Sequence, residues 1–130
     1  MCHQGSCWSI GLHLPPLVWN EDLAKAARYH AHDLGSQKYF DHNTYDRVDN
    51  ELVAIGSTFD RIKKFYDKTH VNSENIAAGN ESPNKTYLQW YNSVGHNENM
   101  FNASSRFVGI GFCQVPNSPH EYYWVFCTAE

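Results

Sequence analysis

The stretch RFVGIGFCQVPNSPHEYYWVFCTA, residues 106–129, decides the fold expected for this chain. Two runs, residues 106–115 and 122–129, are rich in β-branched and aromatic residues, and the turn-forming segment PNSPHE separates them. We therefore predict an antiparallel hairpin that closes the chain. Gly109 and Gly111 lie within the first strand, where the absence of a side chain lets a neighbouring element approach closely.

Upstream of the hairpin, the clearest helical pattern follows Asn20. This residue suits an N-cap, and Glu21 and Asp22 suit the positive start of a helix. Gly35 is the predicted end. One apolar stripe recurs at helical spacing, formed by Leu23, Ala27, His30 and Leu34. Because His30 lies on this stripe, we expect a hydrogen-bonded core side chain there rather than a metal ligand.

Two further helices are expected, in TFDRIKKFYDK (residues 58–68) and SPNKTYLQWYNSVG (residues 82–95). In the second of these, Ser82 serves as the N-cap and Gly95 marks the end. Residues 38–47, KYFDHNTYDR, are interpreted as irregular chain. Helices followed by a terminal hairpin predict an α+β domain, in which an antiparallel sheet packs against helices.

Length and composition predict one folded domain that lacks the positive charge typical of nucleic-acid-binding proteins. The chain has 130 residues, of which 42% are hydrophobic, so it can bury a core. A net charge of −4 gives no electrostatic attraction for nucleic acid. No apolar run is long enough to span a membrane, and the first residues, MCHQGSCWS, do not resemble a signal peptide. The only basic cluster, interpreted as a solvated helix face, is formed by Arg61, Lys63, Lys64 and Lys68.

The four cysteines are Cys2, Cys7, Cys113 and Cys127, and their spacing fits no common zinc site. They allow three disulfide pairings. We expect one disulfide across the terminal hairpin, between Cys113 and Cys127. A second would join Cys2 to Cys7 in a small loop. An even number of cysteines in a small domain suggests an oxidising compartment. The alternative is that buried, reduced cysteines act as small hydrophobic side chains.

Four blocks of sequence follow the pattern of one protein family. They are LVWNEDLAKAARYHAHDLGSQKYFDH (residues 17–42), SENIAAG (73–79), WYNSVGHNENM (90–100), and VGIG (108–111) followed by YYWVFCTA. In this order they resemble the CAP superfamily of cysteine-rich secretory proteins, antigen 5 and pathogenesis-related proteins, also called the SCP domain. The resemblance covers nearly everything from Leu17 onward.

The resemblance implies an α-β-α sandwich, with a three- to four-stranded antiparallel sheet flanked by helices, as a single domain over residues 17–130. Residues 1–16 would form a lead with a cysteine pair, similar to that of secreted bacterial members. The chain is therefore expected in the secreted fraction or the cell envelope.

The resemblance also implies a shared cleft, in which many eukaryotic members place two histidines and two glutamates. By motif position the first histidine is His42, the first acid is Glu74 and the second histidine is His96. The second acid would stand three residues after Trp90, where this chain has Ser93. The set of four is therefore incomplete.

Three interpretations of this cleft stay open. Two imidazoles and a carboxylate would make a divalent site suited to zinc, which the hydroxyl of Ser93 weakens because it is a poor ligand. Ser93 and His96 also share a helix face, and with Glu74 they would follow the logic of a serine hydrolase, although no nucleophile-elbow motif surrounds Ser93. The third interpretation is a structural hydrogen-bond network of His42, Glu74 and His96. Glu98 is a rival acid, interpreted as a surface side chain.

The missing second acid favours binding over catalysis. Our first hypothesis is a secreted or envelope-associated binding protein whose cleft recognises a small ligand, lipid or cell-surface component, with a divalent ion such as zinc held by His42 and His96. One alternative is a metal-dependent hydrolase in which these histidines hold the metal and Glu74 is the general base. The other is a non-catalytic scaffold whose partner surface lies elsewhere.

Overall fold

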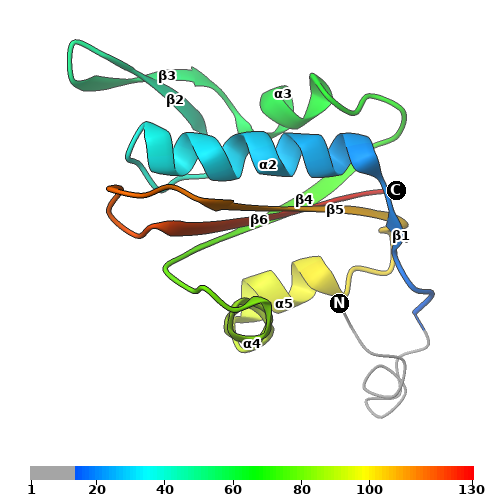
Figure 1. Ribbon diagram of the computed structural model, residues 1–130. Helices are drawn as coiled ribbons and strands as arrows, with labels where there is room; N and C mark the ends of the chain where they lie inside the picture. The colour runs from blue at the N-terminus through cyan, green and yellow to red at the C-terminus, as the bar shows by residue number, and fades with distance from the viewer. Residues whose placement is uncertain (1–13) are drawn as a thin grey trace.

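The order of elements is that of an α+β chain, and the computed structural model describes residues 14–130. Figure 1 shows three layers: α2 covers one face of the central sheet, with α3 on the same side, and α4 and α5 cover the other face. The predicted α-β-α sandwich is therefore confirmed. In chain order the elements are β1 (Val18–Trp19), α2 (Glu21–Ser36), β2 (Thr44–Val48), β3 (Glu51–Gly56), α3 (Thr58–Lys63), β4 (Val71–Ala78), α4 (Pro83–Tyr91), α5 (Val94–Met100), β5 (Phe107–Gln114) and β6 (Tyr122–Ala129).

The central sheet has the strand order β1-β5-β6-β4, so β4 is an edge strand. The predicted terminal hairpin forms, because β5 and β6 pair antiparallel, and β6 also pairs antiparallel with β4. We had predicted a wholly antiparallel sheet. The observed sheet is mixed, because the two-residue β1 runs parallel to β5. β1 directly precedes α2 in the chain, and no hairpin turn joins it to β5, so antiparallel pairing is not imposed on it.

α2 packs closely against β5 at two glycines. A Cβ atom placed on Gly109 would lie 2.1 Å from the backbone nitrogen of Ala24, and one on Gly111 would lie 2.3 Å from that of Arg28. Both distances are far inside van der Waals contact, so any side chain there would push the helix off the sheet. The predicted close approach is confirmed. α2 also begins as predicted, with the side chain of Asn20 capping its first turn.

A second, two-stranded sheet was missed by the sequence analysis. Thr44–Val48 forms β2, which pairs antiparallel with β3, so residues 38–47 are not irregular throughout. The turn is made by Asp49 and Asn50, which both have positive φ, as two-residue hairpin turns require. This hairpin lies on the same side of the central sheet as α2 (Figure 1).

Two predicted helices are shorter than expected. The helix expected at residues 58–68 is regular only to Lys63. The helix expected at residues 82–95 begins as predicted, with Ser82 as N-cap, but it ends at Tyr91. A separate helix, α5, then starts with Ser93 in the N-cap position. Ser93 therefore stands at a junction between two helices rather than inside one.

The predicted disulfide between Cys113 and Cys127 is wrong. In the hairpin register Cys113 is opposite Tyr123, whereas Cys127 is opposite Gly109. The two cysteines are thus offset by roughly 13 Å along the strands, and a disulfide needs Cα atoms less than about 7 Å apart. Within residues 14–130 both thiols are free, and Cys127 is buried in the core. The other predicted pair, Cys2 and Cys7, lies outside the described residues.

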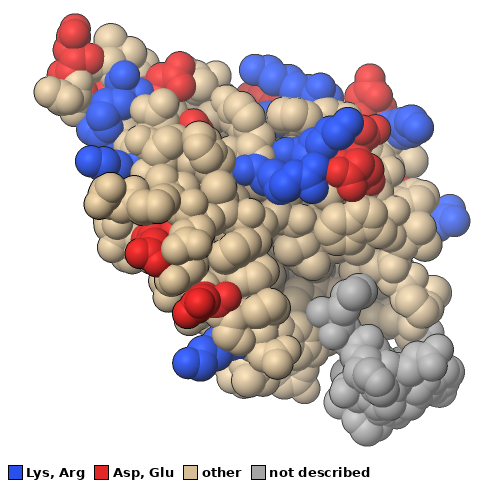
Figure 2. All heavy atoms as spheres, in the orientation of Figure 1, with Lys and Arg blue, Asp and Glu red and all other residues tan. Residues whose placement is uncertain are grey.

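Charged side chains are spread unevenly over the face shown in Figure 2. Lysines and arginines gather on the upper part, over α2 and α3, whereas the lower part, over α4 and α5, carries few charges. No helix within residues 14–130 is both long and apolar enough to cross a membrane.

Candidate functional site

The predicted site residues gather around β4, the edge strand of the central sheet. Glu74 is opposite Cys127 in the strand register, on the face that α2 covers, and Asn75 is directed to the face that α5 covers. His42 lies in the loop between α2 and β2, and His96 lies on α5. The two histidines therefore reach the edge strand from elements on opposite faces. We call the set His42, Arg61, Glu74, Ser93 and His96 the edge site.

The carboxylate of Glu74 is buried and fully engaged, with its side chain 1% exposed. Arg61 donates from Nη1 to Oε2 at 2.7 Å and from Nη2 to Oε1 at 3.1 Å. Nδ1 of His42 lies 3.0 Å from Oε1. Burial alone would raise the pKa of Glu74, but the hydrogen bonds from His42 and Arg61 and the charge of Arg61 hold it below its usual value. Glu74 is therefore a paired carboxylate anion.

Arg61 is the site residue that the sequence analysis missed. Its assignment to a solvated basic face is wrong, because the residue is 3% exposed. Nε donates to Oγ1 of Thr44 at 3.1 Å, and Nη2 donates to the carbonyl of His42 at 2.9 Å. Arg61 thus ties α3 to β2, to β4 and to the loop of His42. A signal was present, since Arg61 stands four residues before Phe65, on the apolar side of its helix.

His42 is oriented by Glu74. With Nδ1 facing the carboxylate, Nε2 makes no hydrogen bond to any residue of the described range, and the side chain is 48% exposed. The hydrogen bond to Glu74 raises the pKa of His42, and burial and the charge of Arg61 oppose this rise. His42 therefore presents one free ring nitrogen to solvent and holds its proton more readily than an ordinary histidine.

His96 is paired with Ser93. Nδ1 of His96 lies 2.9 Å from Oγ of Ser93, and the hydroxyl makes no cap bond to the helix. Burial lowers the pKa of His96, and the charge that His42 carries when protonated lowers it further. The two imidazoles are thus close enough to interact electrostatically, although no direct bond joins them. Nε2 of His96 also lacks a partner within residues 14–130.

Two asparagines hold α5 against β4, and the sequence analysis did not single them out. Nδ2 of Asn75 donates to the carbonyl of His96 at 3.0 Å, and Nδ2 of Asn99 donates to Oδ1 of Asn75 at 2.8 Å. These bonds fix the helix that carries His96 to the strand that carries Glu74. The amide-rich segment after His96 therefore positions the histidine.

His30 is confirmed as a core histidine. It is fully buried on α2, with Nε2 2.8 Å from the carbonyl of Asp41. Nδ1 is buried without a hydrogen-bond partner among the described residues. Burial, followed by the charge of Arg61, lowers the pKa of His30 to about 4. The ring is therefore neutral at physiological pH.

Comparison with known proteins decides the family. The profile of the cysteine-rich secretory protein family, abbreviated CAP, matches residues 11–128. This chain belongs to the CAP family. The uncharacterized protein YkwD of Bacillus subtilis (strain 168) is 34% identical over 101 residues, which are 78% of this chain and 36% of YkwD.

Solved structures share the CAP fold. An extracellular protein containing an SCP domain, from Bacillus anthracis, matches 90% of this chain and 35% of its own with a TM-score of 0.71 and 26% identity. An outer surface protein of Borrelia burgdorferi matches 93% of this chain and 82% of its own with a TM-score of 0.74 and 21% identity. This chain spans about a third of the length of YkwD and of the B. anthracis protein.

The CAP chain does not bring Ser93, His96 and Glu74 into the linear order of a hydrolase triad. Glu74 is bonded to His42 and Arg61, whereas His96 is bonded to Ser93. Glu98, the rival acid, is exposed on α5 and makes no hydrogen bond to His96. The edge site therefore contains two hydrogen-bonded pairs, His42 with Glu74 and His96 with Ser93. The pairs interact electrostatically through the two imidazoles.

The donors of the edge site do not fit a zinc centre of the usual kind. Structural and catalytic zinc ions have three or four protein ligands. Within residues 14–130 no group of three or more His, Cys, Asp and Glu side chains is arranged to hold a metal. Glu74 faces the Arg61 cation, so only the Nε2 atoms of His42 and His96 remain. Zinc at these two histidines stays a prediction from the CAP resemblance.

Proposed function

We propose that this CAP domain is a binding module of an extracellular or cell-surface protein, and that His42 and His96 contact its ligand. A small ligand, a lipid or another cell-surface component would be recognised there. One observation carries the proposal. Both carboxylate oxygens of Glu74 are occupied by hydrogen bonds with Arg61 and His42, whereas Nε2 of each histidine has no partner among the described residues.

The same observation weighs against the hydrolase alternative. A general base must reach solvent or substrate and must have a pKa near the working pH. The carboxylate of Glu74 is 1% exposed, both its oxygens accept hydrogen bonds, and its pKa is lowered. It would serve as the partner that orients His42 rather than as the group that removes a proton.

The histidine pair offers a ligand two different contacts. The raised pKa of His42 favours the protonated ring, which donates from both nitrogens, and the lowered pKa of His96 favours the neutral ring. A ligand with an oxygen acceptor at one end and a second polar group nearby would match both. Relatives described as extracellular or outer-surface proteins support placing that ligand outside the cell.

Binding is tested by NMR of the histidine ring carbons. The chain is titrated with soluble muropeptides and, separately, with phosphatidylglycerol vesicles. We expect one of the two probes to shift the resonances of both His42 and His96, and the response to vanish in the His42→Ala/His96→Ala double variant. The matched control is His32→Ala, since His32 is exposed on α2. A native chain that responds to neither probe would favour the scaffold alternative, and a cleaved muropeptide product would favour the hydrolase.

Zinc binding is expected to be weak. Two nitrogen ligands are fewer than stable zinc sites use, so we expect one-to-one binding no tighter than about 10 µM in a calorimetric titration of the chelator-treated chain. The heat should be lost in the double histidine variant. Nanomolar affinity that depends on these histidines would contradict this prediction and restore the metal-dependent hydrolase hypothesis.

A further inference from the structure

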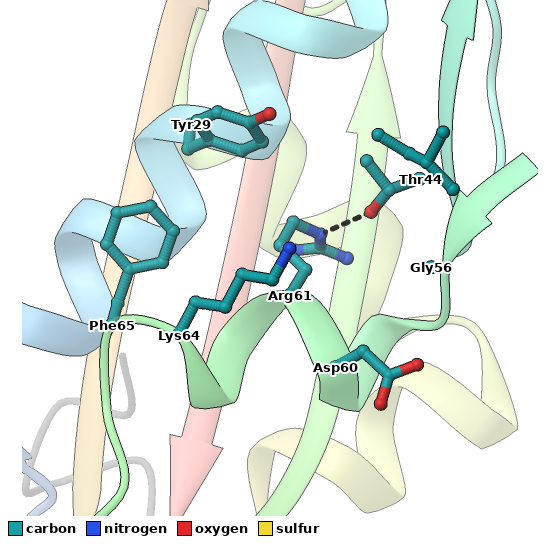
Figure 3. A pocket seen from close by; sticks show the side chains of 8 residues that line it. Tyr29, Thr44, Gly56, Asp60, Arg61, Lys64 and Phe65 are labelled. Atoms are coloured by element: carbon teal, nitrogen blue, oxygen red, sulfur yellow. Dashed lines mark hydrogen bonds between the residues drawn. The ribbon is translucent and has the colours of Figure 1, made fainter.

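Arg61 connects the edge site to a hollow enclosed by α2, α3 and the β2–β3 hairpin. Its volume is about 150 Å³. Figure 3 shows the rings of Tyr29 and Phe65 on one side, Thr44 on the other and Arg61 between them. We call this space the Arg61 hollow. Its lining residues are Tyr29, Thr44, Ile55, Gly56, Asp60, Arg61, Lys64 and Phe65.

The size of the hollow limits its occupant. A cavity of about 150 Å³ accommodates a molecule such as benzene, whereas sites for drug-sized ligands span about 300–1,000 Å³. The Arg61 hollow therefore suits a single ring or a branched side chain. A sterol or a long acyl chain would not be enclosed.

The walls are apolar and open to solvent. The rings of Tyr29 and Phe65 lie 5.7 Å apart between centroids and are tilted by 47°. Tyr29 and Ile55 are 45% and 48% exposed, so their apolar surface is still in contact with water. A ring placed among these three side chains would cover that surface, which favours binding.

One cation that lines the hollow, Lys64, has no close carboxylate partner within residues 14–130. Among the described residues, no carboxylate lies within 4.0 Å of the ammonium group of Lys64, and the charge of Arg61 is paired with Glu74. Asp60 does not offset Lys64 at close range, because its carboxylate is turned away from the hollow in Figure 3 and accepts the backbone N–H of Ser57 at 3.2 Å. The ammonium group of Lys64 is thus open to a carboxylate of a ligand, with the charge of Asp60 acting on it only from a longer distance.

Arg61 adds a buried donor. Its guanidinium has five N–H groups, of which four donate to Thr44, to the carbonyl of His42 and twice to Glu74. The remaining N–H, on Nη1, has no acceptor within residues 14–130. A buried N–H without an acceptor is costly, so an acceptor brought to it would be held.

We propose that the Arg61 hollow binds a monocarboxylate whose apolar part is about the size of a benzene ring. Such a group occurs in a free aromatic acid and in the C-terminal aromatic residue of a peptide. The ring lies among Tyr29, Ile55 and Phe65, and the carboxylate accepts from Lys64 and from Nη1 of Arg61. This site is separate from the ligand contact of His42 and His96 and does not depend on it.

A ligand in the hollow should change the pKa of His42. The positive charge of Arg61 lowers the pKa of His42. A carboxylate beside Arg61 offsets that charge and therefore raises the pKa of His42 further. The ring resonance of His42 thus reports binding at a place that the ligand itself does not touch.

The test compares four probes by NMR titration. Benzoate and the tripeptide Gly-Gly-Phe carry the carboxylate, and benzamide and Gly-Gly-Phe amide lack it. We expect a carboxylate probe to bind at least about tenfold more tightly than its amide, as a charge-assisted bond allows. Binding should also raise the pKa of His42. Tight binding of benzoate alone identifies the free acid as the source, and binding of the tripeptide identifies a chain terminus.

Lys64→Gln and Lys63→Gln make a matched pair of variants. Both lysines are exposed near the end of α3, but only Lys64 lines the hollow. The first change should weaken carboxylate binding about tenfold, whereas the second should leave it unchanged. Three results would each overturn the proposal: equal affinity for acid and amide, equal affinity of the two variants, or no response to any probe at millimolar concentration.

Discussion

The edge site has two halves, and each contains a histidine in a different environment. On the α2 side, His42 is bonded to a buried carboxylate that is itself paired with a buried arginine. On the α5 side, His96 is bonded to a neutral hydroxyl and is held in place by amides. The pKa of His42 is raised and that of His96 is lowered. One half contains buried charges, and the other is a partly buried hydrogen bond to a neutral hydroxyl.

This difference predicts which half of the edge site tolerates substitution. Removing one partner from a buried ion pair leaves an uncompensated charge, whereas a partly exposed hydroxyl or imidazole can bond to water instead. The α2-side half should therefore resist change and hold the fold. The α5-side half can vary without unfolding the chain, which suits a surface that adapts to a ligand.

The largest expected effect is that of Glu74→Gln. The variant leaves the Arg61 guanidinium buried without a counter-charge, so we expect the free energy of unfolding to fall by about 3–5 kcal/mol. The pKa of His42 should fall at the same time, since its largest raising contribution is the hydrogen bond to Glu74. Urea denaturation measures the first quantity, and NMR titration of the ring measures the second.

Glu98→Gln is the matched control, because Glu98 is an exposed acid on α5. Its effect should stay within about 0.5 kcal/mol. If Glu74→Gln destabilised the chain no more than this control, the α2-side half would not hold the fold and the contrast between the halves would fail.

The second effect is a loss of stability in acid that comes from His30, whose ring lies 2.8 Å from the carbonyl of Asp41, the residue before His42. Its pKa is about 4 in the folded chain and about 6.5 when unfolded. The unfolded chain therefore binds the proton first as pH falls. The stability that depends on a neutral His30 is complete above about pH 6.5 and is lost toward pH 4, by about 3 kcal/mol in total. Urea denaturation at a series of pH values measures it.

His42 gives the opposite slope. Because its folded pKa is raised, its contribution is complete below about pH 6.5 and is lost as pH rises through the folded value. Stability should thus reach a maximum near pH 6.5. His30→Gln should remove most of the acid slope and leave the smaller part that comes from the lowered pKa of His96. His32→Gln, which changes an exposed residue on the same helix, should preserve the slope. An unchanged slope in His30→Gln would assign the acid loss to other groups.

The residues that sequence could predict are those fixed by their neighbours in the chain. The cap at Asn20 and the terminal hairpin depend on local sequence pattern. Glycines inside a predicted strand were enough to predict that another element, here α2, packs closely at Gly109 and Gly111. The motif positions of His42, Glu74 and His96 came from the family resemblance, and in the structure of this chain the three residues lie around β4.

What could not be predicted depends on partners far apart in the sequence. Arg61 is buried because Glu74 and Thr44, which are 13 and 17 residues away, supply its acceptors. Cys113 and Cys127 fail to pair because of a strand register that neither residue determines. Two local signals were present and unused: the Asp49-Asn50 turn of the β2–β3 hairpin, and the position of Arg61 four residues before Phe65.

The smallest expected effect is that of Ser93→Ala. Ser93 occupies the N-cap position of α5 without capping it, so the usual loss of a cap bond does not apply. His96 loses one hydrogen bond, and since both residues are only partly buried, water can replace it, so we expect a change below about 1 kcal/mol. The pKa of His96 should stay lowered, because burial and the charge of His42 are its causes.

Urea denaturation and NMR titration of Ser93→Ala and Glu74→Gln compare the two halves directly, by the stability and the histidine pKa that each variant loses. A loss of several kcal/mol in Ser93→Ala would show that the α5-side half is also a rigid network. His42, Glu74 and His96 would then pin segments of the fold together, and the search for a ligand would move to the Arg61 hollow. A small loss with an unchanged His96 pKa leaves His96 free to take part in binding.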